Sequence, residues 1–249
     1  MNLHSIIGSL FCSKEDASQI CTEKDIKQQE MSKDSSQKET SHAEIHHLII
    51  LDESGSMNCV RHQTIMGCNK TIDSIRETAK KDSSIKQYVS IYCFDSVKPR
   101  YILCDVIVSD VKNLTINDFR PYGRTPLYDA IGYTVTKLSR DVAQQDSVGV
   151  VTIITDGYEN DSRNWTLRDV AQLIKDLKEH GWTFTFIGAN IDVKKMASAL
   201  GVDSFLQFTQ SDDGMSKMFE TDSRSRQAYY EKLKRVMASE QYAKMNMDE

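Results

Sequence analysis

The chain has 249 residues, of which 39% are hydrophobic, and its formal net charge is −5 at pH 7. This is enough for one α/β domain with extensions and too little for two domains of average size. The charges are mixed, with no basic block of the kind that binds nucleic acid, and no apolar run is long enough to span a membrane. We therefore expect a cytoplasmic protein with neither nucleic-acid nor membrane partners.

The first 42 residues differ in composition from the rest of the chain. Apolar residues recur at helical spacing near the start, and residues 13–42 are dominated by Ser, Lys, Glu, Asp and Gln. The apolar positions are Leu3, Ile6, Ile7, Leu10 and Phe11. We interpret residues 1–42 as a polar, flexible extension with a short amphipathic segment, which either docks into a groove on a partner protein or packs on the domain's own surface.

The main domain begins near Ala43 with an apolar strand that ends in a cluster of oxygen-bearing side chains. Residues His46–Leu51 run directly into Asp52-Glu53-Ser54-Gly55-Ser56. An Asp-x-Ser-x-Ser spacing delivers small oxygen ligands from one tight turn, which suits Mg²⁺ first and Mn²⁺ or Ca²⁺ next. The same residue types also occur in a plain serine-rich turn with a helix cap. We expect this loop to be exposed, so that Asp52→Ala abolishes metal binding while the fold survives.

Helical and extended patterns alternate along the remaining chain. A hairpin is expected where two apolar runs follow each other past Pro99, which makes one strand antiparallel to the others. Pro126 is expected in the first turn of its helix, and Thr166 is expected to cap the next one. The expected elements are helix 57–80, strands 87–94 and 101–108, helix 127–138, strand 148–155, helix 166–180, strand 182–187, helix 193–200, strand 204–208 and a terminal helix from Gly214.

This alternation predicts a doubly wound, mostly parallel α/β sheet with one antiparallel edge strand and helices on both faces. We divide the chain into an extension at residues 1–42, the α/β domain at residues 43–210 and a helical extension at residues 211–249 that packs on the sheet or on a partner. Loops at the carboxyl ends of neighbouring strands converge on one crevice. Asp52, Ser54 and Ser56 would meet Thr125 and Asp156 there.

Three motifs in this order closely resemble the von Willebrand factor type A (vWA) domain and its metal-ion-dependent adhesion site. They are Asp52-Glu53-Ser54-Gly55-Ser56, then Gly123-Arg124-Thr125-Pro126-Leu127-Tyr128-Asp129-Ala130, then Ile154-Thr155-Asp156-Gly157. The likeness covers roughly residues 43–210 and leaves out both ends of the chain. Within the family, the chain is most similar to stand-alone intracellular domains of bacterial or phage-like origin.

The resemblance implies a role for each matched residue. Ser54 and Ser56 would bind Mg²⁺ through their hydroxyls, and Thr125 would bind it directly or through water. Asp52 and Asp156 would act mainly through water and hydrogen bonds. In the family a Glu or Asp of a partner protein fills the vacant coordination position, so the metal bridges an interface.

Two further positions, Asp129 and Arg124, lie near Thr125 in the sequence. Asp129 matches a common family position and is expected to orient the loop through hydrogen bonds. Arg124 departs from the glycine often found there, and its side chain either flanks the metal or points to solvent.

His46 and His47 are neighbours on a strand and point to opposite faces, so they are expected to be ordinary strand residues and not ligands of one metal.

The resemblance and the residues together predict a binding module and not an enzyme. A phosphoryl-accepting role for Asp52 would call for a second carboxylate where Ser54 stands, and neither a nucleophile elbow nor a phosphate-binding glycine loop is present. The alternatives are a metal-free scaffold in an ATPase- or kinase/phosphatase-associated complex, as in stress or defence systems, and a metal-dependent hydrolase. The partner is expected to be a protein that presents Asp or Glu.

Overall fold

The structure is a computed structural model that describes residues 43–143, 147–189, 192–209 and 211–245. The amphipathic segment predicted within residues 1–42 lies outside this range. The elements in chain order are β1 (Ala43–Asp52), η2 (Gly55–Val60), α3 (Arg61–Lys81), β2 (Ile85–Phe94), β3 (Arg100–Ile107), η3 (Val108–Asp110), η4 (Ile116–Asp118), α4 (Leu127–Asp141), β4 (Ser147–Thr155), α5 (Leu167–Lys178), β5 (Thr183–Gly188), α6 (Val193–Ala199), β6 (Ser204–Gln207) and α7 (Asp212–Met245).

In this part of the chain the strands form one six-stranded sheet in the order β3-β2-β1-β4-β5-β6. The β2–β3 pair is antiparallel, and the other pairs are parallel. The predicted fold class is therefore confirmed, including the antiparallel edge strand. β1 lies between β2 and β4 in the middle of the sheet, so the loop that follows β1 is flanked by the loops that follow its two neighbours.

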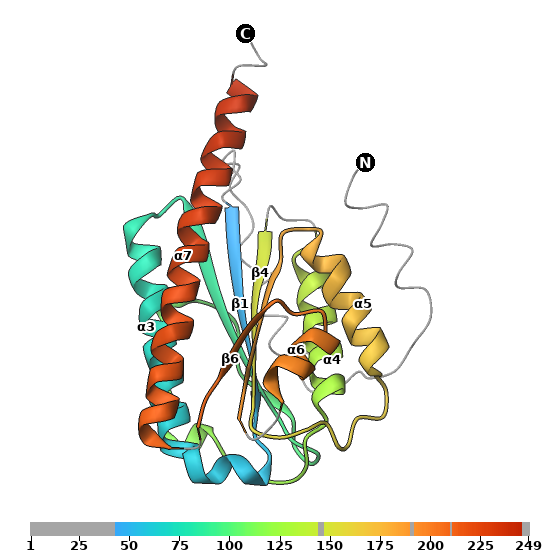
Figure 1. Ribbon diagram of the computed structural model, residues 1–249. Coiled ribbons are helices and arrows are strands. Elements are labelled where there is room, and N and C mark those ends of the chain that lie inside the picture. Colours follow the sequence, from blue (N-terminus) through green and yellow to red (C-terminus); the bar gives the residue numbers. More distant parts are fainter. Residues whose placement is uncertain (1–42, 144–146, 190–191, 210, 246–249) are drawn as a thin grey trace, which may run out of the picture. The chain divides into compact units, whose positions relative to one another are not determined.

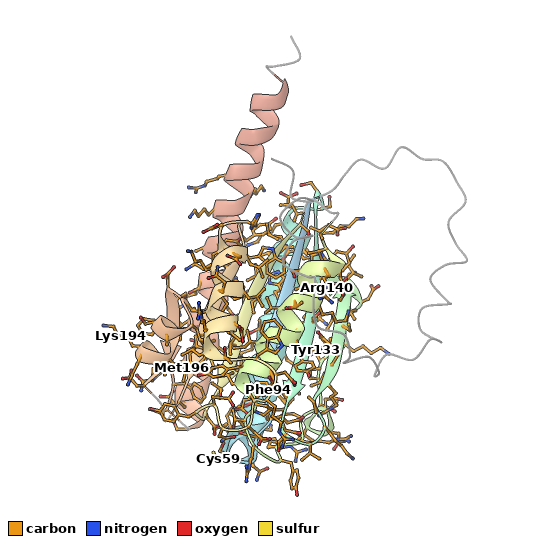
Figure 2. The ribbon with its side chains drawn as sticks, turned by 90° about the vertical axis from the view of Figure 1, so that its right-hand side faces the viewer. Cys59, Phe94, Tyr133, Arg140, Lys194 and Met196 are labelled. Carbon is orange, nitrogen blue, oxygen red and sulfur yellow. The ribbon has the colours of Figure 1, made fainter. Side chains whose placement is uncertain are left out.

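Helices cover both faces of the sheet (Figure 1). α3 and α7 lie on one face, and α4, α5 and α6 lie on the other. Each face has its own apolar core, because alternate residues of β1 point to opposite sides: Leu48 and Ile50 pack toward α4, and Ile49 and Leu51 pack toward α3. Phe94 and Tyr133, labelled in Figure 2, lie on the α4 side.

The C-terminal helix α7 packs back on the domain. Met218 and Phe219 are buried in the core on the α3 side. A Cβ added to Gly67 of α3 would lie 1.9 Å from Cδ2 of Phe219, so a glycine is needed where the two helices meet. One compact unit begins at Ala43 and includes α7. The part of α7 that carries these contacts is thus continuous with the domain's core.

One helix start differs from the sequence prediction. The helix predicted from Met57 begins only at Arg61, because residues 55–60 form the 3₁₀ turn η2, in which Met57 N–H donates to the Ser54 carbonyl. This turn buries the Met57 side chain completely. α4 begins at Leu127 as predicted, and Pro126 is its N-cap residue, one position before the first turn in which it was expected. The predicted cap of α5 is confirmed, since Thr166 and Asp169 form a capping box.

A buried polar layer separates α7 from β1 and β4. His47 is 6% exposed, and its two ring nitrogens contact Gln87 Oε1 at 3.1 Å and Arg226 Nη1 at 3.3 Å. Arg226 also pairs with Asp222 at 2.8 Å within α7 and reaches Thr152 of β4. With Arg226 donating to Nδ1, the imidazole is neutral and donates from Nε2. His46 points to the other face, where it contacts Asp105 and stacks on Tyr88.

None of the helices in the described ranges is both long enough and apolar enough to cross a membrane.

The environment of His47 predicts a pH-dependent stability. Burial, followed by the nearby Arg226, lowers the pKa of His47 from 6.5 to about 3. Below pH 6.5 the unfolded chain takes up a proton at this position and the folded chain does not, so the free energy of unfolding falls as the pH drops from 6.5 toward 3. The slope from this group approaches about 1.4 kcal/mol per pH unit.

Urea unfolding between pH 7 and pH 5 measures this slope. His47→Gln should flatten the profile relative to the unchanged chain, and His62→Gln, on the exposed side of α3, should leave it unaltered. Identical profiles for the chain and its His47→Gln variant would show that His47 does not stay neutral in the fold.

Candidate metal centre

The carboxyl ends of β1 and β4 place the predicted site residue Asp52 beside Thr155. Leu51 of β1 pairs with Ile154 of β4, so Asp52 and Thr155 end adjacent strands. Thr155 Oγ1 donates to Asp52 Oδ2 at 2.6 Å, and the Ser54 N–H donates to Asp52 Oδ1 at 2.7 Å. Both oxygens of Asp52 are thereby held. Its carboxylate fixes the position of residues Ser54-Gly55-Ser56, which we call the serine turn, relative to β4.

A chain of hydrogen bonds continues from this carboxylate across the site. Ser54 Oγ and Ser56 Oγ lie 3.1 Å apart, and Ser56 Oγ donates to Asp156 Oδ1 at 2.7 Å. Ser54 and Asp156 are each 3% exposed, whereas Ser56 is exposed. The structure therefore brings Asp52, Ser54, Ser56 and Asp156 together, although the first and last lie about a hundred positions apart in the chain.

Thr125 is held beside this group by the loop that follows β4. Its N–H donates to Asn160 Oδ1 at 2.8 Å, and its carbonyl accepts from the Asn160 N–H at 3.2 Å. A Cβ added to Gly157 would lie 3.5 Å from Thr125 Oγ1, so the threonine hydroxyl faces the Asp156-Gly157 turn. Thr125 is 3% exposed. All five residues proposed as metal ligands from the sequence thus meet at the same edge of the sheet.

The loop after β4 and the start of α4 hold each other in place, because a side-chain carboxylate on each accepts backbone N–H groups of the other. Asp129 accepts the N–H groups of Arg163, Asn164 and Trp165, which is the loop-orienting contact expected of it. Glu159 accepts the Tyr128 N–H at the start of α4. Sequence reasoning did not single out Glu159 or Asn160. The signal was a run of turn-forming residues directly after Asp156-Gly157, which a search for metal ligands passes over.

The expectation that the Asp52 loop is exposed is wrong. Asp52 and Glu53 are 0% exposed, and only Gly55 and Ser56 of the motif reach the surface. Burial raises the pKa of Asp52 to about 6, and hydrogen bonds from Thr155 and Ser54 oppose that rise. Asp52→Ala is therefore not expected to leave the fold intact on the ground of exposure, because the substitution removes the acceptor of two buried donors.

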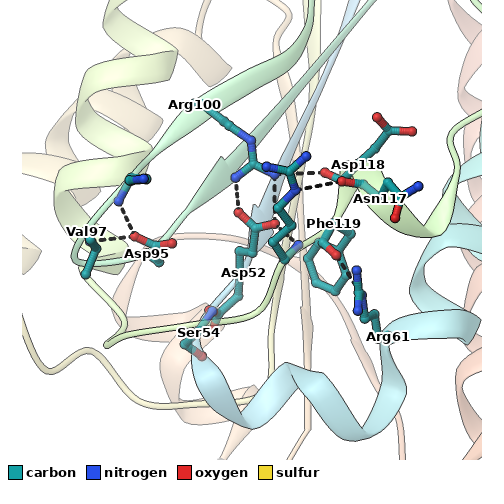
Figure 3. A network of polar contacts seen from close by, with 12 residues as sticks. Asp52, Ser54, Arg61, Asp95, Val97, Arg100, Asn117, Asp118 and Phe119 are labelled. Atoms are coloured by element: carbon teal, nitrogen blue, oxygen red, sulfur yellow. Dashed lines mark hydrogen bonds and ion pairs between the residues drawn. The ribbon is translucent and has the colours of Figure 1, made fainter.

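Glu53, the unassigned position of the motif, ties the site to the edge of the sheet. Its carboxylate forms a two-point ion pair with Arg100 of β3, whose Nη2 lies 3.0 Å from Oε1, and it also accepts the Arg120 N–H. The Glu53 carbonyl accepts the Tyr122 N–H at 2.7 Å. Arg100 in turn donates to the Asp118 carbonyl at 2.8 Å, in the network drawn in Figure 3. Glu53 therefore sets the path of the loop that leads to Thr125.

Arg124 points toward solvent. Its side chain is 72% exposed, and its guanidinium lies 3.6 Å from the Asp161 carboxylate. Of the two positions considered from the sequence, the structure favours the solvent-facing one. An exposed pair at this distance contributes little to stability.

The donor set at this edge fits a hard cation. It consists of the hydroxyls of Ser54, Ser56 and Thr125 and the carboxylates of Asp52 and Asp156, with no nitrogen or sulfur donor among them. A cation placed there would also favour the ionised form of the buried Asp52. In the described ranges no group of three or more His, Cys, Asp and Glu side chains is placed to hold a metal, so a site here would depend on hydroxyl ligands.

The Glu53–Arg100 pair predicts a coupling that a double-mutant cycle can measure. Arg100→Met leaves the fully buried Glu53 carboxylate without its cation and should lower the free energy of unfolding by about 3 kcal/mol. Adding Glu53→Gln to Arg100→Met should restore part of this loss, because a neutral amide replaces the unpaired charge. Urea unfolding of the two single variants and the double variant gives the coupling energy. Strictly additive losses would mean that the two side chains do not interact.

Among the comparisons with known proteins, the one with solved structures supports the fold. No family model and no curated protein sequence matches the chain. Among solved structures, the vWF domain of the type V pili tip protein Mfa5 from Porphyromonas gingivalis matches at a TM-score of 0.53 and 9% identity, covering 74% of this chain and 95% of that one. The pilus adhesin SpaC from Lactobacillus rhamnosus GG matches at 0.53 and 13%, covering 76% and 30%.

A third match is proximal thread matrix protein 1 from the mussel byssus, at a TM-score of 0.50 and 18% identity, covering 74% of this chain. The chain spans 45% of the length of that mussel protein and 30% of SpaC, so it corresponds to one part of each. At these identities the matches show the architecture alone. The described domain has the fold of a vWA domain.

Proposed function

We propose that this chain is a metal-dependent protein-interaction module. In this proposal Ser54, Ser56 and Thr125 hold Mg²⁺, or Mn²⁺ or Ca²⁺ in its place, with Asp52 and Asp156 behind them. The bound ion supplies an open coordination position for a Glu or Asp of a partner protein. The observation that carries the proposal is the grouping of these five oxygen donors from three separate loops.

The charge of the donor set supports a bridging role for the metal. Two of the five proposed ligands are carboxylates, and both are already hydrogen-bonded within the protein. The three neutral hydroxyls leave a dication electrophilic, and a carboxylate from outside is the ligand that satisfies it best. The fold is shared with a protein described as a pilus adhesin, which is consistent with this role.

Catalysis has less support at this site. Hydrolysis needs a group that is free to take up or deliver a proton within reach of a substrate. Asp52 is buried with both oxygens occupied, and Asp156 accepts from Ser56. The module is therefore proposed to be non-enzymatic.

A metal-free scaffold, as part of an ATPase- or kinase/phosphatase-associated complex, is the second candidate. The observation in its favour is that the donors partly satisfy one another: Ser56 Oγ donates to Asp156, and Thr155 donates to Asp52. Such closure lets the loops keep their positions without an ion. Metal titration separates the two candidates.

Calorimetric titration with Mg²⁺ should show one binding event in the full chain. Ser56→Ala should weaken it at least tenfold, because the variant loses a direct hydroxyl ligand while the exposed position carries none of the core. Ser109→Ala, an exposed serine on η3 away from the site, is the matched control and should titrate like the unchanged chain. Equal titration curves for Ser56→Ala and the unchanged chain would show that the metal binds at another place. If neither variant nor the unchanged chain gave any heat of binding, the metal-free scaffold would be favoured.

A partner complex isolated with the tagged full chain should dissociate in EDTA and reform when Mg²⁺ is added back. Thr125→Ala should lower the affinity of the complex, because the threonine hydroxyl is one of the proposed ligands. Surface plasmon resonance with the purified partner measures both effects. If the affinity is the same in EDTA and in Mg²⁺, the partner binds another face of the domain.

A further inference from the structure

Large apolar side chains are unusually exposed on the loops around the candidate metal centre. Tyr122 is 67% exposed, Val97 is 54% exposed and Tyr158 is 53% exposed. These are the three most exposed large hydrophobic side chains in the described ranges, and we call them the apolar rim. The other exposed ones, Met66, Ile116, Tyr133 and Phe205, lie singly on α3, η4, α4 and β6.

Val97 and Tyr122 lie on the β2 side of the serine turn. Val97 follows β2, and a Cβ added to Gly123 would lie 3.5 Å from Val97 Cγ2. The Gly123 carbonyl accepts the Gly55 N–H at 3.2 Å, which places Tyr122 and Gly123 against the serine turn. Asp95 accepts the N–H groups of Val97 and Lys98 and fixes the Val97 loop, which Figure 3 shows together with Ser54.

Tyr158 lies on the other side of the turn. It follows Gly157, whose Cα faces Thr125 Oγ1, in the loop at the end of β4. The Tyr158 hydroxyl accepts the Asp192 N–H at 3.0 Å, so the side chain is anchored while much of its ring stays exposed. Because β1 lies between β2 and β4 in the sheet, the loop that carries Ser54 and Ser56 lies between the loop of Val97 and the loop of Tyr158. The Tyr158 ring extends from its loop toward Asp192 and so marks the outer limit of this surface.

Exposed aromatic and aliphatic side chains on fixed loops around a candidate site indicate a binding surface. Tyrosines bury large areas with little loss of conformational entropy, and they are enriched at the points of an interface that carry its affinity. A single carboxylate on a metal ion gives little discrimination among acidic proteins. Arg124 is exposed, but its guanidinium lies 3.6 Å from the Asp161 carboxylate, so it adds little net charge to this surface.

We propose that the partner of this module is a protein segment in which one Asp or Glu is flanked by large apolar or aromatic side chains. The carboxylate completes the coordination of the metal, and its apolar neighbours cover Tyr122 and Val97 on one side and Tyr158 on the other. This rests on the proposed function, because the metal fixes where the carboxylate enters. The apolar rim then sets which acidic segments are accepted.

A displayed library of random short linear peptides, selected on the full chain in Mg²⁺ and eluted with EDTA, tests this inference. The enriched peptides should contain an acidic residue with an aromatic or large aliphatic residue close to it. Fluorescence anisotropy of one such peptide should show roughly five- to tenfold weaker binding to Tyr122→Ser and to Tyr158→Ser. Met66→Ser, which removes an exposed apolar side chain from α3, is the matched control and should bind like the unchanged chain.

The outcomes separate the inference from the function on which it rests. Mg²⁺ titration of the two tyrosine variants should equal that of the unchanged chain, which shows that the metal centre is intact. Acidic peptides that EDTA releases but that lack apolar neighbours, or that bind all variants equally, overturn the role of the rim and leave the metal-dependent module standing. Peptides retained in EDTA, or no enrichment in Mg²⁺ over EDTA, overturn both.

Discussion

Two consecutive buried carboxylates at the end of the central strand hold the candidate site together. Asp52 binds across to β4 through Thr155, and Glu53 binds across to β3 through Arg100. Neither has measurable exposure, so each must have its partners, because an unpaired buried carboxylate costs several kcal/mol. The loop after β1 is therefore fixed by contacts to strands on either side of β1 in the sheet. This constraint positions Ser54 and Ser56 through contacts within the protein alone.

The remaining loops are fixed mainly by side chains that accept backbone N–H groups. Asn160 and Glu159 hold the segment from Thr125 to Tyr128, and Asp129 holds the segment that follows Ser162. Contacts of this kind set the path of a loop without occupying its surface. The hydroxyls of Ser56 and Thr125 can then be presented from loops whose own polar needs are already met.

Sequence reasoning predicted the fold correctly because its signals are local, and it chose five residues that the structure brings to one edge of the sheet. Residues 48–51 are a continuous apolar run and residues 148–155 are mostly apolar, and the residue after each run is an acid, Asp52 or Asp156. It failed where the deciding contact joins distant parts of the chain. The burial of Asp52 depends on Thr155, and the role of Glu53 depends on Arg100, neither of which a local pattern identifies. Met57 likewise reads as the start of a long helix, yet the turn at Ser54 keeps residues 55–60 in a 3₁₀ conformation.

The chemistry of the site divides affinity from selectivity. Neutral hydroxyl ligands would leave the ion's charge incompletely compensated, so the attraction for an outside carboxylate would be strong but the same for every acidic residue. Discrimination must then come from what surrounds the ion, and the structure offers an exposed arginine in a loose pair and three exposed apolar side chains on fixed loops. The arginine acts at long range and is screened by salt. The apolar side chains act only on contact, so they are the part of this surface that can distinguish one acidic segment from another.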